Sequence, residues 1–363
     1  MKRLVLLGGG HAHVHVLDAL ARAPLPDTEV TLVSPYPQQI YSGMLPGWIA
    51  GHYPLDACAI ALPPLAARAG CTLRQTRAIA LDFAARDVLC ADGARIGFDW
   101  LSIDTGPTTA RHRIAGADAH ALAVRPIESF VDGIARLLAE AAETPTLAVA
   151  IIGGGAAGVE LAFALRQRCP DARLSLIGSA ARPLDGLPRR LQHRANALLA
   201  NRRIAWHGGR RAQTVDATGV ALDDGTRIAA RHVLQVTGAA APRWPAAAGL
   251  ACDDGGFIRV NASLRSTSHP FVFAAGDIAR YSDPRPKSGV FAVRAGPPLA
   301  ANLRAAIGAE ALTPWRAQRR ALYLISTGNR HALAAWGPLA WWGDWVWRWK
   351  DRIDRRFVAR FSA

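Results

Sequence analysis

The sequence of 363 residues predicts an α/β fold that contains one internal repeat, and three observations support this prediction. Half of the residues are apolar and a fifth are charged, which is typical of globular proteins. A short apolar run, a glycine cluster and an apolar-periodic segment occur at residues 4–14 and recur at residues 149–159. A second apolar run follows each copy, at residues 26–33 and 170–177. Each copy therefore predicts a strand, a tight turn, a helix and a second strand.

The glycine turns of this repeat have the spacing of dinucleotide-binding motifs. The second copy carries Gly153, Gly155 and Gly158, whereas the first carries Gly8 and Gly10 and has His13 at the third place. The first glycine allows a sharp exit from the strand, the second lets backbone approach a pyrophosphate, and the third lets helix and strand pack closely. The helix N-terminus favours the phosphate charge. Two copies in register predict two Rossmann-like (three-layer ββα) domains that bind two dinucleotides.

The acidic residue that binds ribose hydroxyls in many such motifs is missing from both copies. Ser34 stands at the end of the second strand in the first copy, and Gly178 stands there in the second. Arg182 follows four residues after Gly178 and would contact a 2′-phosphate; the alternative is a surface charge. We therefore expect NADPH to be tolerated.

Three later segments complete the pattern of two nucleotide domains. Apolar runs end in Thr105 and Gly106, in Thr237 and Gly238, and in Gly276 and Asp277. The two Thr-Gly pairs fall where the chain would cross between domains, so the second nucleotide domain is expected as an insertion in the first. The predicted ranges are 1–115 and 241–304 for the first domain, 116–240 for the inserted domain, and 305–363 for a C-terminal region.

Charge and cysteine content exclude several classes of protein. Lys plus Arg number 43 against 28 Asp plus Glu, but no nucleic-acid recognition motif accompanies them, so no nucleic-acid partner is expected. The five cysteines form no close pair, which argues against a disulfide framework, a redox dithiol or a zinc site and favours a reducing, cytoplasmic compartment. No metal site is expected at His11, His13 and His15, because alternate residues of a helix diverge.

The C-terminal region predicts a hairpin and an amphipathic helix rich in Trp and Arg. The expected apolar stripe consists of Trp342, Val346, Trp349, Ile353, Phe357 and Phe361, and the basic side of Arg348, Lys350, Arg352, Arg355, Arg356 and Arg360. Such a helix binds anionic headgroups without spanning a bilayer, which predicts a peripheral contact with the cytoplasmic face of the membrane. The alternative is that the stripe packs on the first domain or on a second subunit of a homodimer.

Four segments carry a resemblance to a known family, at residues 8–13, 41–47, 286–293 and 349–355. Together with the motif order, they make the chain similar over essentially its whole length to the pyridine nucleotide-disulfide oxidoreductase superfamily. Within it, the chain resembles the flavoprotein domain fused ahead of selenide, water dikinase and its stand-alone relatives, and type II NADH dehydrogenases are related. The resemblance implies an FAD domain with an NAD(P) domain inserted in it, FAD as cofactor and NADH or NADPH as co-substrate.

The resemblance also implies roles for individual residues. Asp277 would accept hydrogen bonds from the ribityl chain of FAD, or cap a helix. Glu160 would lie near nicotinamide and flavin, the alternative being a solvent-facing helix residue, and Lys287 would stabilise negative charge on the reduced flavin, the alternative being a surface lysine. The other expected cofactor-binding residues are Gly8, Gly9, Gly10, His11, His13, Ser34, Thr105, Gly106, Gly153, Gly155, Gly158, Gly178, Arg182, Gly238 and Gly276.

The lack of a cysteine pair separates the possible chemistries. Disulfide reductases need such a pair beside the flavin, and sulfide:quinone oxidoreductases need cysteines that carry sulfur. Hydride transfer from nicotinamide to flavin needs only stacking, alignment and charge stabilisation. We therefore expect an FAD-dependent NAD(P)H dehydrogenase that passes electrons to a quinone or similar small acceptor. The alternatives are a flavoprotein of selenium or sulfur metabolism acting on a chalcogen substrate, and a non-enzymatic nucleotide sensor.

Overall fold

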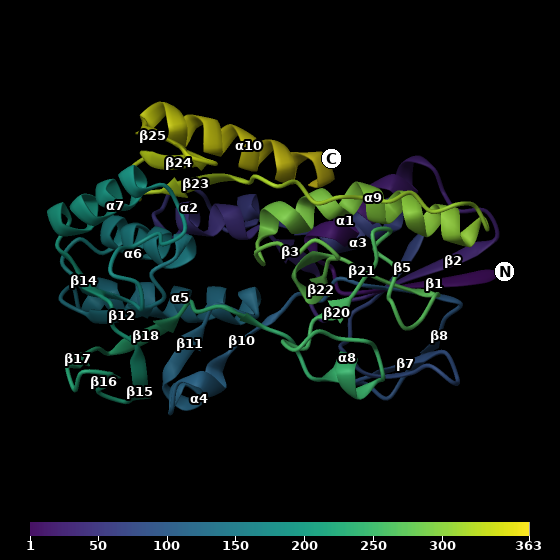
Figure 1. Ribbon diagram of the computed structural model, residues 1–363, viewed down its shortest axis with the longest axis horizontal. Helices are drawn as coiled ribbons and strands as arrows, with labels where there is room; N and C mark the ends of the chain where they lie inside the picture. The colour runs from purple at the N-terminus through teal and green to yellow at the C-terminus, as the bar shows by residue number, and fades with distance from the viewer. Residues whose placement is uncertain (363) are drawn as a thin grey trace.

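The computed structural model describes residues 1–362, and Ala363, the last residue of the predicted C-terminal region, lies outside them. The chain forms two lobes, each built on a five-stranded sheet (Figure 1). The first sheet has the order β21-β9-β1-β2-β5 and the second β11-β18-β12-β13-β14, and all their strands are parallel. The strands are β1 (Lys2–Leu7), β2 (Thr28–Val33), β5 (Cys71–Arg74), β9 (Trp100–Ile103), β11 (Ala121–Ala123), β12 (Ala148–Ile152), β13 (Arg173–Gly178), β14 (Ile204–Gly208), β18 (His232–Gln235) and β21 (Val272–Ala274).

The central strands are buried on both faces, which explains their unbroken apolar sequences. The last four residues of β1 and all five residues of β12 are buried. Leu7 at the end of β1 pairs with Val33 of β2, and Ile152 at the end of β12 pairs with Ile177 of β13. The carboxyl ends of neighbouring strands therefore meet at one edge of each sheet, where a glycine turn follows.

Each lobe has three layers: helices, the parallel sheet and a three-stranded antiparallel sheet. The helices are α1 (His11–Arg22), α3 (Leu62–Arg68) and α9 (Gly289–Ile307) in the first lobe, and α5 (Ile127–Glu143), α6 (Ala156–Arg168) and α7 (Arg189–Asn201) in the second. The antiparallel sheets are β6 (Ala78–Asp82), β7 (Asp87–Cys90) and β8 (Arg95–Gly97), and β15 (Ala212–Asp216), β16 (Gly219–Leu222) and β17 (Arg227–Ala229). The predicted α/β fold with ββα layering is confirmed.

The chain leaves the first lobe and returns to it at one place. There β10 (Thr108–Thr109) pairs antiparallel with β19 (Ala239–Ala240). Short elements complete the chain: β3 (Gln38–Ile40), β4 (Ala59–Ala61), β20 (Ile258–Arg259), β22 (Ala279–Arg280), α2 (Leu45–Ile49), α4 (Ala117–His120), α8 (Trp244–Ala247), and the 3-10 turns η1 (Ser42–Met44), η2 (Asp56–Cys58), η3 (Arg111–Arg113) and η4 (Gly276–Ile278). Among residues 1–362, no helix combines the length and apolarity needed to cross a bilayer.

The C-terminal region differs from the prediction in two respects. The predicted hairpin is extended by a third strand, and three antiparallel strands precede the last helix: β23 (Leu322–Ser326), β24 (Ala332–Trp336) and β25 (Leu339–Gly343). The helix α10 (Asp344–Ser362) begins after Trp342, so that residue of the predicted stripe lies on a strand. Lys350, expected on the basic side, is buried, whereas Trp349 and Ile353 of the predicted apolar stripe are each 39% exposed. In Figure 1, α10 extends from the second lobe toward the first.

Candidate active site

A cavity of about 1230 Å³ joins the carboxyl edges of the two parallel sheets. Pockets for one small ligand have volumes of roughly 300–1000 Å³, so this cavity has room for more than one. Strand ends of this kind are where open α/β sheets bind ligands. Fifteen of the eighteen predicted site residues line it: Gly8, Gly9, Gly10, His11, Ser34, Thr105, Gly106, Gly153, Gly155, Gly158, Glu160, Gly178, Gly238, Asp277 and Lys287.

The other three predicted residues do not line the cavity. His13 is buried, its Nδ1 lies 2.6 Å from the Gly8 carbonyl oxygen, and its Nε2 lies 2.8 Å from the Ser102 hydroxyl. The imidazole therefore replaces the third glycine by bonding to the strands behind the turn, and burial lowers its pKa to about 4. Gly276 is buried against the Asp104 carboxylate, and Arg182 is exposed outside the lining.

The first glycine turn is a cradle in which side chains do not fit. Gly8 has a φ of +89°, and a Cβ there would lie 2.5 Å from the Asp104 carbonyl oxygen, while a Cβ at Gly10 would clash with the Asp104 carboxyl. Asp104 itself accepts hydrogen bonds from the amides of Ala12 (2.7 Å) and His13 (3.0 Å) at the start of α1. Burial raises the pKa of Asp104 to about 7, although these amides oppose the rise.

Two buried polar atoms at the cavity add to the fit of this cradle for a dinucleotide. His11 Nε2 and Ser288 Oγ have no hydrogen-bond partner among residues 1–362, and both residues line the cavity. A buried polar group without a partner is costly, so a polar ligand is expected to satisfy it. The backbone and the helix N-terminus at the turn are suited to bind a pyrophosphate. His11 Nε2 and Ser288 Oγ are suited to hydrogen-bond a polar cofactor such as FAD.

The second glycine turn is equally crowded. Gly153 has a φ of +136°, and a Cβ there would lie 2.6 Å from the Val236 carbonyl oxygen. A Cβ at Gly158 would clash with the Gly153 carbonyl, so helix α6 and strand β12 approach as closely as the motif requires.

The predicted flavin-side residues Asp277 and Lys287 have protein partners. Asp277 lies 3.7 Å from the Arg125 guanidinium. Burial raises the pKa of Asp277, and Arg125 is the first of the groups that oppose this rise. Lys287 donates to the Ala279 carbonyl and lies 4.0 Å from the centre of the Phe257 ring, and burial lowers its pKa to about 8.

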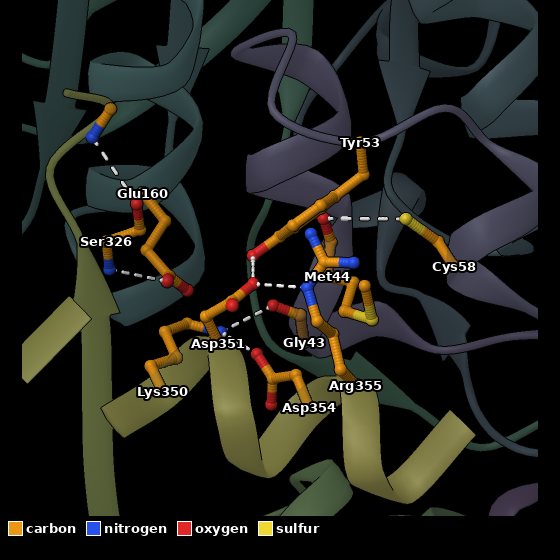
Figure 2. Close-up of polar contacts among 11 residues, drawn as sticks. Gly43, Met44, Tyr53, Cys58, Glu160, Ser326, Lys350, Asp351, Asp354 and Arg355 are labelled. Carbon is orange, nitrogen blue, oxygen red and sulfur yellow. Dashed lines mark hydrogen bonds and ion pairs between the residues drawn. The ribbon is translucent and has the colours of Figure 1, made fainter. Parts of the chain in front are cut away.

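A cluster of charged side chains from the second lobe and the last helix adjoins Glu160 (Figure 2). One oxygen of Glu160 accepts a hydrogen bond from the Ser326 amide at 2.8 Å. The buried Lys350 ammonium donates to the Gly43 carbonyl and to Asp354, both at 2.6 Å. Burial raises the pKa of Glu160 to about 7, and the nearby Lys350 charge limits that rise. For Lys350, burial lowers the pKa, but Asp354 and Glu160 outweigh burial and the net direction is upward.

Several residues of the site were not predicted from the sequence. Asp104 and Arg125 reach the cavity from strand ends and loops, and Arg210 and Arg211 line its second-lobe end. Lys350 was predicted only as part of the basic side of the last helix, and no role was predicted for Asp354. Their four-residue spacing in line with buried Val346 and Val358 was an available signal.

None of the five cysteines lines the cavity. Cys58 is buried beside the carbonyls of Met44 and Pro54, and burial raises the pKa of its thiol to about 12. A thiol of this kind is protonated at neutral pH and is a poor nucleophile. No cysteine is therefore available at the cavity for thiol chemistry.

Comparisons with known proteins agree with this geometry. A family model described as pyridine nucleotide-disulphide oxidoreductase matches residues 2–296. The NADH dehydrogenase-like protein YutJ of Bacillus subtilis is 29% identical over 196 residues, which are 53% of this chain and 52% of YutJ, so the match spans about half of that relative. The demethylphylloquinone reductase NdbB of Synechocystis is 26% identical over 293 residues, 77% of this chain and 72% of NdbB.

Solved structures share the fold at low sequence identity. The sulfide:quinone oxidoreductase of Aquifex aeolicus superposes with a TM-score of 0.81 at 18% identity, covering 100% of this chain and 92% of that one. NDH2 of Plasmodium falciparum superposes with a TM-score of 0.80 at 14% identity, covering 99% and 97%. The chain belongs to the pyridine nucleotide-disulphide oxidoreductase family, and thus to the oxidoreductases that use FAD and NAD(P)H.

Proposed function

We propose that the protein passes electrons from NAD(P)H through FAD to a quinone-like acceptor. The observation that carries this proposal is one cavity that holds both glycine turns, has Glu160 beside the buried Lys350, and has no cysteine in its lining. The name of NdbB, a demethylphylloquinone reductase, supports a quinone as the class of acceptor. The missing cysteine disfavours the alternative of a sulfur or selenium substrate carried on a thiol.

The residues of the chain would divide the cavity between two nucleotides. The turn at Gly8 to Gly10 would hold the pyrophosphate of FAD, and Asp277 its ribityl chain. The turn at Gly153 to Gly158 would hold the pyrophosphate of NAD(P)H. FAD, when bound, supplies the centre that accepts a hydride and returns electrons. The residues of the protein align the two nucleotides and supply the charges around them.

Glu160 and Lys350 would supply the proton chemistry at the acceptor end. Reduction of a quinone to a quinol consumes two electrons and two protons, so a proton donor in the cavity assists it. A carboxyl whose pKa is about 7 holds a proton in a substantial fraction of molecules at neutral pH. The Lys350 ammonium, oriented by Gly43 and Asp354, would stabilise the Glu160 carboxylate after the proton leaves.

An exposed aromatic face would bring the protein to a lipid-dissolved acceptor. This face consists of Trp345, Trp349 and Ile353 of α10, each at least 39% exposed. Trp345 and Trp349 stack at 6.4 Å between ring centres. Arg348, Arg352 and Arg356 on the same helix are exposed beside them. Aromatic anchors beside arginines suit the interface of an anionic membrane, so we propose a peripheral membrane contact here.

The test of the function is anaerobic reduction of the purified protein by NADH or NADPH, followed by reoxidation with a panel of acceptors. Bleaching of the flavin absorbance by a nicotinamide nucleotide, and its recovery with a quinone, are the expected results. Recovery with selenium or sulfur compounds but not with quinones would contradict the proposed acceptor. A flavin that neither nucleotide reduces would contradict the proposed reaction.

A further inference from the structure

The end of β13, where nucleotides of this fold place their adenine ribose, has an unusual construction. Gly178 ends the strand, and its neighbour on β14 is Gly208. A Cβ at Gly178 would clash with Cη2 of the Trp206 indole, and a Cβ at Gly154 would lie 2.6 Å from the same atom. The indole therefore occupies the space of a side chain at position 178. The carboxylate that binds a ribose diol in many such sites is sterically excluded here.

Two arginines lie beside Gly178 instead. The Arg210 amide donates to the Gly178 carbonyl at 3.1 Å, and the Gly209 amide donates to the Ala180 carbonyl at 2.8 Å. These bonds hold the start of the β14–β15 loop against the end of β13. Arg210 and Arg211 both line the cavity, together with Ser179.

The two arginines differ in their partners. Arg210 Nε lies 3.0 Å from the Asp224 carboxylate, so much of its charge is already compensated. Arg211 is exposed and has no carboxylate within 4.0 Å among residues 1–362. A guanidinium of this kind is suited to a phosphate, which it binds through charge-assisted, often bidentate hydrogen bonds.

We propose that this end of the cavity binds the 2′-phosphate of NADPH, with Arg211 as the main contact and Ser179 and Arg210 beside it. The protein then selects NADPH over NADH. The inference rests on the proposed function only in that the second glycine turn binds a nicotinamide nucleotide. It replaces the predicted role of Arg182, which follows Gly178 in sequence but does not line the cavity.

The test uses fragments that bind without redox chemistry. Isothermal titration calorimetry on the FAD-loaded protein compares adenosine 2′,5′-bisphosphate with adenosine 5′-monophosphate. The bisphosphate is expected to bind at least tenfold more tightly. Arg211→Ala is expected to lower its affinity by tenfold to a hundredfold, the usual range for one charge-assisted contact, and to leave the monophosphate unchanged. Arg182→Ala is the matched control and is expected to change neither.

Two results would overturn the inference. Either the two fragments bind equally to the wild type, or Arg211→Ala leaves the ratio of their affinities unchanged, as it would if the guanidinium stacked on adenine and its loss weakened both fragments equally. Steady-state KM values for NADPH and NADH then provide a second measurement, and only the NADPH value is expected to rise in Arg211→Ala. If the fragments behave as expected but neither nucleotide reduces the flavin, the phosphate site stands and the proposed function fails.

Discussion

The substitution Lys350→Met removes the cation from a charge pair that has almost no solvent. The side chains of Lys350 and Asp354 are 9% and 8% exposed, and their Nζ and Oδ2 atoms are 2.6 Å apart. Without the ammonium, the Asp354 carboxylate and the Gly43 carbonyl lose a buried hydrogen-bond donor. Removing one member of a buried ion pair typically destabilises a protein by about 3–5 kcal/mol. We expect a loss of this size in the free energy of unfolding.

The same substitution changes the titration of Glu160. The Lys350 charge holds down the pKa of Glu160, so its loss moves that pKa further above about 7. The folded-state pKa already exceeds that of an unfolded glutamic acid, so the Glu160 contribution to stability is present at low pH and is lost as pH rises through the folded-state value. A higher pKa of Glu160 means that this contribution to stability is retained up to a higher pH. A rate that needs protonated Glu160 is expected to shift its alkaline limb in the same direction.

Two assays and one control variant separate these effects. Urea unfolding of the FAD-loaded protein measures stability, and the pH profile of quinone reduction measures the titration of Glu160. The double variant Lys350→Met with Asp354→Leu removes both charges and is expected to recover most of the stability. Its alkaline limb is still expected to shift upward, but by less than in Lys350→Met, because the Lys350 charge lowers the pKa of Glu160 more than the Asp354 charge raises it. The reasoning is refuted if Lys350→Met unfolds within 1 kcal/mol of the wild type, roughly the range of ordinary substitutions, or if neither variant moves the pH profile.

Three further predictions follow from the site and the surface. Gly10→Val places a side chain against the Asp104 carboxyl and in the phosphate cradle, so the purified protein is expected to be colourless; a full complement of FAD would contradict the cradle. In the wild type, quinone reduction is expected to fall as pH rises through about 7 and Glu160 loses its proton, whereas Glu160→Gln abolishes this titration; an unchanged profile in the variant would contradict the role of Glu160. Replacing both Trp345 and Trp349 by Ser is expected to reduce cosedimentation with anionic vesicles several-fold; unchanged cosedimentation, or loss of a dimer instead, would contradict the membrane contact.

The glycine turns could be predicted from sequence because the constraint on them is local. Gly8 and Gly153 have positive φ, where other residues are strained, and each stands directly after an apolar strand. The strand, turn and helix that form one motif are consecutive in the chain. Spacing alone therefore carries the information, and the two turns meet at one cavity because both follow carboxyl ends of parallel strands.

The arginine proposed to contact the 2′-phosphate could not be predicted in this way. Arg182 is close to Gly178 in sequence, but the loop after β13 leads it away from the cavity. Arg211 comes from the loop after the neighbouring strand β14, and its position depends on the pairing of Gly178 with Gly208. That register is set by the packing of the whole sheet, which includes the Trp206 indole against Gly154 and Gly178.

The last helix shows why a count of apolar residues does not locate a buried face. Its buried line runs through Val346, Lys350, Asp354 and Val358, four residues apart, and two of these residues are charged. A count of apolar residues gives a stripe that contains both buried Val346 and exposed Trp349 and Ile353. A charged pair at this spacing is buried only because the Gly43 carbonyl and Glu160, remote in sequence, provide partners. α10 thus turns an ammonium toward the proposed proton donor and aromatic rings toward solvent, so a single helix connects the proposed acceptor end of the cavity with the surface proposed to contact the membrane.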